Sequence, residues 1–395
     1  MKREVFWKNP GYKAGKPLTG IHETEYLIVG AGITGLTLAH FLLERGVKAT
    51  NIALVEAGVV GSGSTGRSAG ILIPELETET NLGWDTFVVR YGLKLAKEYR
   101  HSYREALDTV EKLIKKGEIA CEARWGDFLI LARNEEAKER VVSDLRARRL
   151  MGERPRALKG VYLANEFGSP GYVFAERDVE ALSVNPLALA HGIATYLRRR
   201  GVRVFENSPL LSLYGTTARF PSGAISFKKI IYARGVGEAH RLLHNYVTTI
   251  AVTEKLKKRE LEELKLADLD LFIDEEGTKS FHYGKITGDG RLLLGYGDAR
   301  VKTRIAETEL HGAHVRNVER FLKTMFPHTA LKIAYAWSGV YAIGRKLTPI
   351  IAFKKNEVVV NGAGIQLGSI AAAEYVATKL MGKKHPLDAL YKELQ

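Results

Sequence analysis

The hydrophobic pattern near the start of the chain predicts a strand, a helix and a second strand in close succession. Residues 26–29 form a short apolar run, residues 34–45 have the spacing of an amphipathic helix that stops at Gly46, and residues 52–55 form a second apolar run. A unit of this kind begins an α/β fold with parallel strands.

The same alternation returns twice further along the chain, separated by a region richer in strands and turns. The predicted helices are residues 88–116, 135–150, 186–200, 307–325 and 369–380, and the predicted strands are residues 128–131, 202–205, 210–214, 230–233, 279–283, 291–295 and 357–360.

An α/β layer that the chain enters three times implies a discontinuous domain with a second domain inserted into it. We expect residues 1–87, 183–246 and 335–395 to form the α/β domain. Residues 88–182 and 247–334 are expected to form the inserted domain, a mostly antiparallel β-sheet with helices. The expected fold class is α/β in the first domain and α+β overall.

Composition indicates the cellular compartment and argues against a membrane-spanning helix. The chain has 395 residues, 45% of them hydrophobic, which excludes a disordered or collagen-like protein. Its one cysteine, Cys121, excludes an internal disulfide framework and favours a cytoplasmic location. Residues 1–21 lack the apolar run of a secretory signal. Residues 26–43 carry no formal charge, but their three glycines favour a strand, a turn and a helix over a membrane-spanning helix.

The charge balance at first suggests an anionic partner. Lysine and arginine total 59 against 45 acids, a formal net charge of +14, and residues 133–159 contain nine cations and five acids. Because the signs alternate along a helical pattern without an aromatic platform or a zinc finger, we expect a solvated helix face and no nucleic-acid partner. Only Gln366 and Gln395 are glutamines, and few thermolabile side chains with many charges are typical of a thermophilic protein.

Residues 30–35 match the pattern G-x-G-x-x-G of a dinucleotide-binding turn. A second match at residues 61–66 is followed by Gly70 before a helix of ordinary length could form. The first match lies between a predicted strand and a predicted helix, and Glu56 closes the next strand 21 residues after Gly35. This context favours the first match.

Each glycine of that turn has a physical role in the dinucleotide interpretation. Gly30 permits the tight turn, Gly32 lets the backbone approach a pyrophosphate, and Gly35 lets the helix and strand pack closely. Glu56 would accept hydrogen bonds from the adenosine ribose and would repel a ribose phosphate, which argues against NADP. The alternative is an ordinary turn with a solvent-facing Glu56.

The turn does not distinguish NAD from FAD, but two further glycine-rich segments favour FAD. Residues 63–70 are suited to wrapping a second phosphate and a ribityl chain. Residues 362–365 precede another helix, whose amino end could face a polar ring edge. A cofactor held from both ends of the chain is a long one.

These residues resemble the D-amino-acid-oxidase-like flavoproteins, which include glycine and sarcosine oxidases. The amino-terminal segment is most similar to the γ-glutamylputrescine-oxidase-like branch. The resemblance covers nearly the whole chain in scattered blocks, of which the first 70 residues are the most specific. The blocks are Phe6-Trp7 with Pro10, residues 18–20, 30–35, 56–57 and 63–70, Tyr283 with Lys285, and residues 289–292, 337–339, 348–350 and 362–364.

The resemblance implies an FAD-dependent oxidoreductase that oxidises the C–N bond of an amine or amino acid. Hydride would pass from the carbon next to the nitrogen to flavin N5, and water would hydrolyse the resulting imine. The discontinuous domain would bind FAD, without a covalent link because no cysteine lies near the expected position. By position, the FAD-binding residues would be Gly30, Gly32, Ile33, Thr34, Gly35, Glu56, Ala57, Ser64, Thr65, Gly66, Arg67, Ser68, Ala69, Leu210, Ala233, Gly235, Gly339, Gly362, Gly364, Ile365 and Gln366.

The sequence departs from this family where a substrate carboxylate is usually held. Glycine oxidases carry an arginine shortly after the W-x-G segment, and sarcosine oxidases carry a lysine where Gln366 stands. Both cations are missing here, which favours an amine, or a carboxylate held by another group. Arg345 and Lys346 could be a displaced carboxylate clamp.

Each candidate catalytic or substrate-binding residue also has a purely structural interpretation. Tyr283 could be a core aromatic residue, and Lys285 could be a solvated edge charge. His311 and His314 could share a helix face, but no third ligand has metal spacing with them, so we expect no metal site. The candidate catalytic residues are Tyr283, Lys285, Tyr341 and Arg67, with His282 as a further substrate group.

The electron acceptor and the assembly stay open at this point. The partners expected are a small amine or amino acid, and either oxygen or an acidic electron-acceptor protein, with the oligomeric state undecided. Three alternatives remain: the catalytic subunit of a heteromeric dye-linked proline or sarcosine dehydrogenase, an FAD-dependent tRNA-modifying enzyme supported only by the charge of +14, and a non-catalytic flavin-binding subunit.

Overall fold

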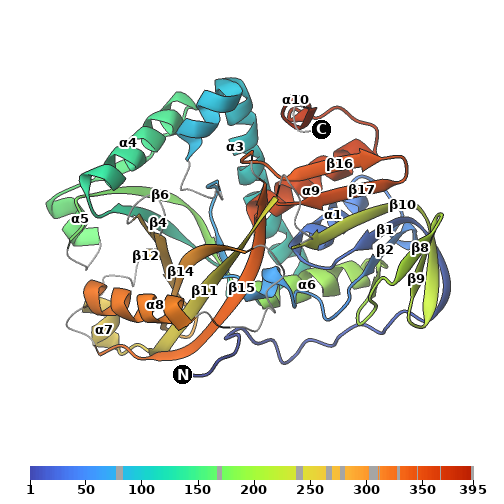
Figure 1. Ribbon diagram of the computed structural model, residues 1–395, viewed down its shortest axis with the longest axis horizontal. Coiled ribbons are helices and arrows are strands. Elements are labelled where there is room, and N and C mark those ends of the chain that lie inside the picture. Colours follow the sequence, from blue (N-terminus) through green and yellow to red (C-terminus); the bar gives the residue numbers. More distant parts are fainter. Residues whose placement is uncertain are drawn as a thin grey trace.

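Two sheets lie side by side in the computed structural model of the chain, with helices on their outer faces (Figure 1). The structure describes all residues except 77–82, 167–170, 237–242, 264–268, 276–280, 302–309, 311, 327–329, 345, 365 and 393–395.

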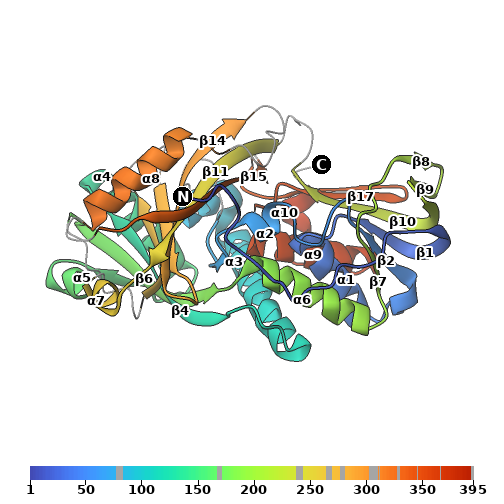
Figure 2. The ribbon, with the colours of Figure 1, turned by 90° about the horizontal axis from the view of Figure 1, so that it is seen from below.

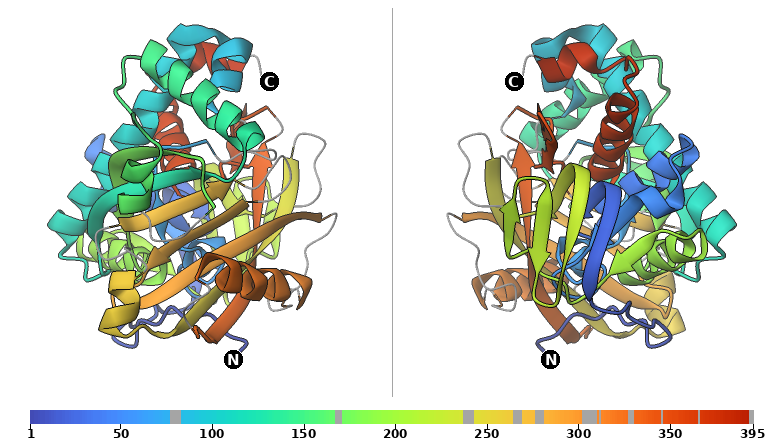
Figure 3. Two further views of the ribbon diagram at one scale, coloured as in Figure 1. Left: turned by 90° about the vertical axis from the view of Figure 1, so that its left-hand side faces the viewer. Right: turned by 90° about the vertical axis from the view of Figure 1, so that its right-hand side faces the viewer.

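The first sheet is built around the amino-terminal strand β1, and its strands are parallel except at the edges. Its order is β16-β17-β10-β1-β2-β7, and the hairpin β8–β9 extends one end of β10 (Figure 3, right). The bounds are β1 Gly20–Val29, β2 Ile52–Val55, β7 Arg203–Phe205, β8 Ser212–Tyr214, β9 Thr217–Phe220, β10 Gly223–Gly235, β16 Ile350–Lys354 and β17 Glu357–Asn361.

The parallel strands read as continuous apolar runs because both of their faces are buried. On one face, Ile28 of β1 and Ile231 of β10 belong to the same core as Leu36 of helix α1 and Ile370 of helix α9. On the other face, Leu27 packs with residues of the β8–β9 hairpin. The helices of this layer are α1 Ile33–Glu44, α6 Pro186–Arg199 and α9 Leu367–Leu380.

Helix α3, Trp84–Gly117, joins the helices of the parallel sheet although its residues were expected in the inserted domain. It contains a kink at Gly92, and its Val110 and Leu113 belong to the same hydrophobic core as α1 and α9. The division of the chain into two domains stays a prediction.

The second sheet is antiparallel except where β12 lies beside β4. Its order is β15-β11-β14-β13-β12-β4-β6-β3, with β5 beside β6. Helix α8 packs on it through Val318 and Phe321. The bounds of its strands are β3 Ile71–Leu72, β4 Arg124–Ala132, β5 Arg156–Leu158, β6 Phe174–Ser183, β11 Leu243–Lys255, β12 Leu269–Glu275, β13 Phe281–Ile286, β14 Arg291–Val301 and β15 Ile333–Gly344.

The remaining helices of the chain are α2 Ser64–Arg67, α4 Glu135–Leu150, α5 Val161–Glu166, α7 Lys258–Glu263, α8 Gly312–Met325 and α10 Asp388–Lys392.

The predicted fold class, with one α/β part and one mostly antiparallel part, is confirmed. The glycine-rich segment 61–70 is not a plain loop, because it contains the short helix α2. Strand β15, which includes Trp337, lies in the second sheet, whereas the sequence suggested that residues from 335 onward belong to the first domain. The helix predicted at residues 307–325 is found as α8, which has the predicted carboxyl end. Part of the predicted start lies outside the described residues.

The arginine-rich helix α4 is only partly the solvated face expected from its charges. Arg140 and Glu136 form an ion pair of that kind, 3.0 Å between Nη1 and Oε1. Arg148, however, is buried and pairs with Glu153 and with the fully buried Glu176. Burial raises the pKa of Glu176 to about 7, despite the opposing charge of Arg148.

The amino-terminal strap, residues 2–19, runs along the underside of both sheets (Figure 2). It starts beside β15, where the Lys2 backbone exchanges hydrogen bonds with Ala334 and Ala336, and it leads into β1. In the part of the chain that the structure describes, no helix combines the length and the apolar character needed to cross a membrane.

Candidate functional site

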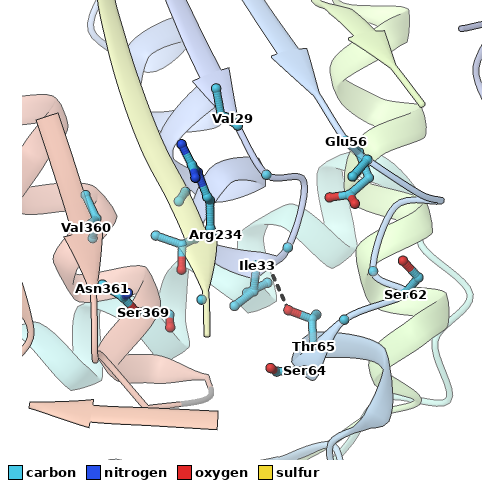
Figure 4. A pocket seen from close by; sticks show the side chains of 18 of the residues that line it. Val29, Ile33, Glu56, Ser62, Ser64, Thr65, Arg234, Val360, Asn361 and Ser369 are labelled. Atoms are coloured by element: carbon cyan, nitrogen blue, oxygen red, sulfur yellow. Dashed lines mark hydrogen bonds between the residues drawn. The ribbon is translucent and has the colours of Figure 1, made fainter. Parts of the chain in front are cut away.

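A cavity of about 630 Å³ lies at the carboxyl ends of the parallel strands β1, β2 and β10 (Figure 4). Its walls come from the turn after β1, residues 55–58 and 61–65, residues 208–210, the end of β10, and residues 360, 361, 363 and 364. Tyr341 of β15 adds a contribution from the second sheet. The size and place are typical of a small-molecule site in an open α/β sheet.

The turn at residues 30–35 is fixed by close backbone contacts. Gly30 has φ of +109°, and a Cβ on it would overlap the carbonyl oxygen of Ala233. A Cβ on Gly35 would in turn overlap the carbonyl oxygen of Gly30. Helix α1 therefore starts directly against the ends of β1 and β10, with its amino end at the cavity.

Glu56 is half-buried, and its carboxylate accepts hydrogen bonds from two backbone N–H groups. Its Oε2 accepts a hydrogen bond of 2.9 Å from the Ala31 N–H, and its Oε1 accepts one of 3.0 Å from the Gly58 N–H. Both carboxylate oxygens of Glu56 are thus bonded to the backbone, whereas the alternative placed this side chain in solvent. A carboxylate offers about four acceptor sites, so capacity remains for a ligand hydroxyl.

The amino end of α1 offers a positive pole to the cavity. Its N-cap residue is Gly32, which has no capping side chain, and the first turn carries no acidic residue. The Ile33 N–H donates to Thr65 Oγ1 over 3.0 Å, which brings α2 to the same helix end (Figure 4). This arrangement suits an anion such as a pyrophosphate.

Arg234 also lines the cavity, although it was not among the residues predicted for the site. Its guanidinium lies 4.4 Å from the centre of the Tyr232 ring, two residues earlier on β10. A basic residue between Ala233 and Gly235, two predicted positions, was the only available signal. Ser62, Asn361 and Ser369 line the cavity and were missed in the same way.

The predicted cofactor residues fall into two groups. Those that line the cavity are Gly30, Gly32, Ile33, Thr34, Glu56, Ala57, Ser64, Thr65, Leu210, Ala233, Gly235 and Gly364. Those that do not line it are Gly35, Gly66, Arg67, Ser68, Ala69, Gly339, Gly362 and Gln366. Ile365 and the proposed clamp residue Arg345 lie outside the described residues.

Gln366 and Ser68 do not line the cavity, but they meet within three residues of Gly364 and Thr65, which do. Gln366 Nε2 donates to Ser68 Oγ over 2.7 Å. Gln366 has φ of +127° at the start of α9, a conformation that costs energy for a residue with a side chain. Such strain is frequent at functional sites, so it indicates that the amino end of α9 belongs to the functional site.

The candidate tyrosines both come from strands of the second sheet. Tyr341 lies opposite Tyr246 in the β11–β15 ladder, with 5.8 Å between ring centres. The hydroxyl of Tyr283 lies 3.2 Å from Thr248 Oγ1, and its ring occupies the space above Gly295. Of the two candidates, Tyr341 lines the cavity.

Lys285 and His282 are placed differently from the expectation. Lys285 is 2% exposed, so it is not a solvated edge charge, and it does not line the cavity. His282 faces α8, because neighbouring residues on a strand alternate faces, and it stacks on Phe321 with 3.6 Å between ring centres. Burial, with a contribution from Arg133, lowers the pKa of His282 to about 3.

Metal chemistry finds no support in the described part of the chain. His314 has Thr249 Oγ1 as a neighbour at 3.4 Å, and His311 lies outside the described residues. Among the described residues, no group of three His, Cys, Asp or Glu side chains could hold a metal ion.

Comparison with known proteins defines the class to which this cavity belongs. Residues 25–378 match the family model described as FAD dependent oxidoreductase, and the chain belongs to this family. This confirms the resemblance drawn from the sequence blocks.

Two curated relatives cover most of the chain. Gamma-glutamylputrescine oxidoreductase of Escherichia coli is 25% identical over 338 residues, which are 80% of this chain and 73% of that protein. The probable oxidoreductase OrdL of Haemophilus influenzae is 24% identical over 355 residues, 84% of this chain and 76% of that protein.

Solved structures share the fold at lower identity. Glycine oxidase from Geobacillus kaustophilus superposes with a TM-score of 0.76 and 18% identity, over 94% of this chain and 98% of that chain. L-Proline dehydrogenase from P. horikoshii superposes with a TM-score of 0.76 and 15% identity, over 95% of this chain and 97% of that chain.

Proposed function

We propose that this protein oxidises the C–N bond of an amine or amino acid, with FAD as its bound electron acceptor. The observation that carries the proposal is the cavity at the strand ends, which is lined both by Glu56 and by the amino end of α1, whose N-cap residue Gly32 has no capping side chain. The similarity to gamma-glutamylputrescine oxidoreductase supports an amine-type substrate.

The residues present fit FAD. Glu56 keeps acceptor capacity for ribose hydroxyls, and the amino end of α1 suits the pyrophosphate. Non-covalent binding is supported by Cys121, which is buried in the helical core, where burial raises the pKa of its thiol to about 11. A thiol that stays protonated in the core is a poor nucleophile.

FAD supplies the chemistry by accepting a hydride at N5 from the carbon next to the substrate nitrogen, and the nitrogen loses a proton as the imine forms. The chain has to bind and orient the substrate beside that position and to exclude water until transfer is complete. We assign substrate contact to Tyr341 and Tyr283, whose rings offer apolar faces and hydroxyl groups. Arg67, whose Cβ neighbours Gly339, is the cation we assign to a substrate carboxylate.

The decisive experiment is a flavin spectrum of the purified protein followed by anaerobic addition of primary amines, secondary amines and amino acids. The expected result is a bound flavin whose absorbance near ~450 nm, a property of the oxidised cofactor, bleaches with at least one of these compounds. A colourless protein that takes up no added FAD would contradict the proposal. A flavin that no amine bleaches would instead favour the non-catalytic flavin-binding subunit.

A dehydrogenase that uses an acceptor other than oxygen is the second candidate, favoured by the fold shared with the L-proline dehydrogenase. Reduction of a dye without oxygen consumption would support it, and an acidic redox protein would then be the natural partner for a chain of charge +14. Salt-sensitive RNA binding, without flavin reduction by small amines, would favour the tRNA-modifying alternative.

The cytoplasmic location and the heat adaptation remain proposals based on composition. Localisation by fractionation and a melting curve test them. The oligomeric state is open and can be measured by light scattering on the FAD-loaded protein.

A further inference from the structure

Three side chains from distant parts of the chain donate hydrogen bonds to backbone carbonyls of one short segment, residues 67–70. Trp337 Nε1 donates to the Arg67 carbonyl over 2.8 Å, and Trp7 Nε1 donates to the Ser68 carbonyl over 2.8 Å. Lys285 Nζ donates to the Gly70 carbonyl over 3.0 Å. We call Trp7, Trp337 and Lys285 the carbonyl clamp.

The members of the carbonyl clamp are buried and support one another. Their exposed fractions are 3% for Trp7, 3% for Trp337 and 2% for Lys285. Lys285 Nζ lies 4.9 Å from the centre of the Trp7 ring and donates a second hydrogen bond, of 2.7 Å, to the Val184 carbonyl. An ammonium group in this position is favourable only when its hydrogen bonds are made, so its presence fixes the backbone around it.

Apolar packing alone does not require these donors. The surrounding cluster contains Ile250, Val252 and Leu293, and an aliphatic or phenyl side chain could fill the same space without a polar atom to satisfy. What the N–H groups add is the orientation of successive peptide planes in the segment.

That orientation decides what the segment presents on its other side. A trans peptide holds its C=O and N–H in opposite directions, so the Ala69 N–H points away from Trp7. The same segment carries Ser68 Oγ, which accepts from Gln366, and Arg67, whose Nε donates to the Ser338 carbonyl. A few residues earlier, Thr65 receives the Ile33 N–H at the cavity.

We propose that Trp7, Trp337 and Lys285 are positioning residues that hold residues 67–70 in the conformation that the flavin end of the cavity requires. Lys285 acts through the backbone of this segment and not as an acid or base. The amino-terminal strap, which carries Trp7, is thereby a working part of the site. This inference rests on the proposed function, because it assigns the flavin ring to this end of the cavity.

The test compares variants that remove a donor and keep the shape. Trp7→Phe and Trp337→Phe remove the N–H, Lys285→Met removes the charge at similar length, and Lys285→Arg keeps donor groups. For each, FAD is titrated into apoprotein, the visible spectrum of the bound flavin is recorded, and the melting temperature is measured. On a substrate that bleaches the wild-type protein, kcat and KM are measured over a range of pH.

Loss of each donor is expected to weaken FAD binding about tenfold and to shift the flavin spectrum, since a buried carbonyl loses a donor that orients its peptide plane. The Gly70 carbonyl keeps the Val184 N–H as a second donor, at 2.9 Å, in Lys285→Met. With FAD saturating, kcat should fall without a new ionisation in its pH profile, and Lys285→Arg should restore most of the affinity. The double variant Trp7→Phe/Lys285→Met should lose less than the product of the two single effects, because the residues act on one segment.

Two matched controls isolate the effect. Trp125→Phe alters an indole on β4 that is 44% exposed. Lys229→Met removes an ammonium that also donates to a backbone carbonyl, that of Lys355, at the surface. Both should keep the wild-type affinity and spectrum.

The wild-type protein tests the proposed function, and the variants test the clamp. If the wild-type protein binds no FAD, both ideas fail. If it binds FAD and the variants lower only the melting temperature, the clamp is merely structural and the inference is wrong. A Lys285→Met variant with normal affinity and spectrum, but with an ionisation missing from its kcat profile, would show that Lys285 acts chemically. If that variant does not fold, Trp7→Phe and Trp337→Phe decide the matter.

Discussion

At the scale of single residues, two carboxylates stabilise the loops around the cavity by accepting backbone N–H groups. Glu56 serves Ala31 and Gly58, as described above. Glu206 is fully buried, and its Oε1 accepts a hydrogen bond of 2.7 Å from the Val60 N–H. Hydrogen bonds of this charged kind are stronger than neutral ones, so both acids should be sensitive to removal of the charge.

Replacing Glu56 by glutamine should weaken the site. The Glu56→Gln side chain presents an NH₂ group to one of the two N–H donors, so one hydrogen bond is lost while the shape is kept. We expect about tenfold weaker FAD binding in a titration of apoprotein, equivalent to about 1.4 kcal/mol. Glu136→Gln, on the exposed face of α4, is the control, and unchanged affinity in Glu56→Gln would contradict this role.

His282 should make the fold sensitive to mild acid. Its pKa is about 3 in the folded protein and 6.5 in the unfolded chain, so the unfolded state binds a proton first. Its contribution to stability is full above pH 6.5 and is lost as the pH falls toward 3. Between pH 7 and pH 5 the loss should be about 2 kcal/mol. Urea denaturation of His282→Phe should show a smaller loss of unfolding free energy between pH 7 and pH 5 than the wild-type protein. An identical dependence of unfolding free energy on pH in both proteins would refute the assignment.

At the scale of elements, the junction of β1 and α1 depends on Gly35. A methyl group there would meet the Gly30 carbonyl and push the helix away from the strand. We expect Gly35→Ala to lower the free energy of unfolding by about 1–3 kcal/mol and to weaken FAD binding, as overpacking does elsewhere. Gly11→Ala is the matched control, since a Cβ on Gly11 meets no atom within 4 Å. Equal stability of the two variants would be inconsistent with this packing.

The elements that could be predicted from the sequence are those whose pattern is local. The β1–α1–β2 unit and its glycine turn can be predicted because two apolar runs, helix spacing and a glycine turn coincide within residues 26–55. Strands β11 and β15 have almost entirely buried residues, yet they mix Thr248, Thr249 and Ser338 with aromatic residues. Without alternation between two faces, such strands have no readable period.

The side chains of the site could be predicted only where a backbone rule fixes them. The glycines and Glu56 follow from the geometry of the turn. The burial of Lys285 and His282 does not, because it depends on side-chain contacts with distant segments: Lys285 donates to the Gly70 and Val184 carbonyls, and His282 stacks on Phe321. The same is true of Trp7, whose contact with Ser68 joins residues 61 positions apart.

At the scale of the whole molecule, the amino-terminal strap connects the two sheets. Near its end, Tyr12 stacks on His191 with 3.6 Å between ring centres, and its hydroxyl donates to Glu206 Oε2 over 3.0 Å. The Leu18 N–H donates to Ser208 Oγ over 2.9 Å, and Ser208 lines the cavity. The strap is therefore coupled to both ends of the site.

Glu206→Gln should loosen the strap. It removes the charge that Tyr12 and Arg198 share, and charged hydrogen bonds of this kind contribute about 1.5–3 kcal/mol. We expect a loss of stability of that order and faster proteolysis within residues 2–19, measured on the FAD-loaded protein. The control is Glu111→Gln, which alters a half-exposed carboxylate that pairs with the exposed Lys115 on α3, and it should behave as wild type. Equal proteolysis rates in both variants would show that the strap is held by other contacts.

The order of strands in the parallel sheet has a consequence for how the protein is made. β10 lies between β1, which leaves the ribosome early, and β17, whose last residue is Asn361. A nascent chain therefore carries an unpaired edge on β10 until most of the protein has been synthesised, and unpaired edges invite association with other chains. Because Val360, Asn361, Ala363 and Gly364 line the cavity, the site is incomplete until this segment has been synthesised and has joined the sheet.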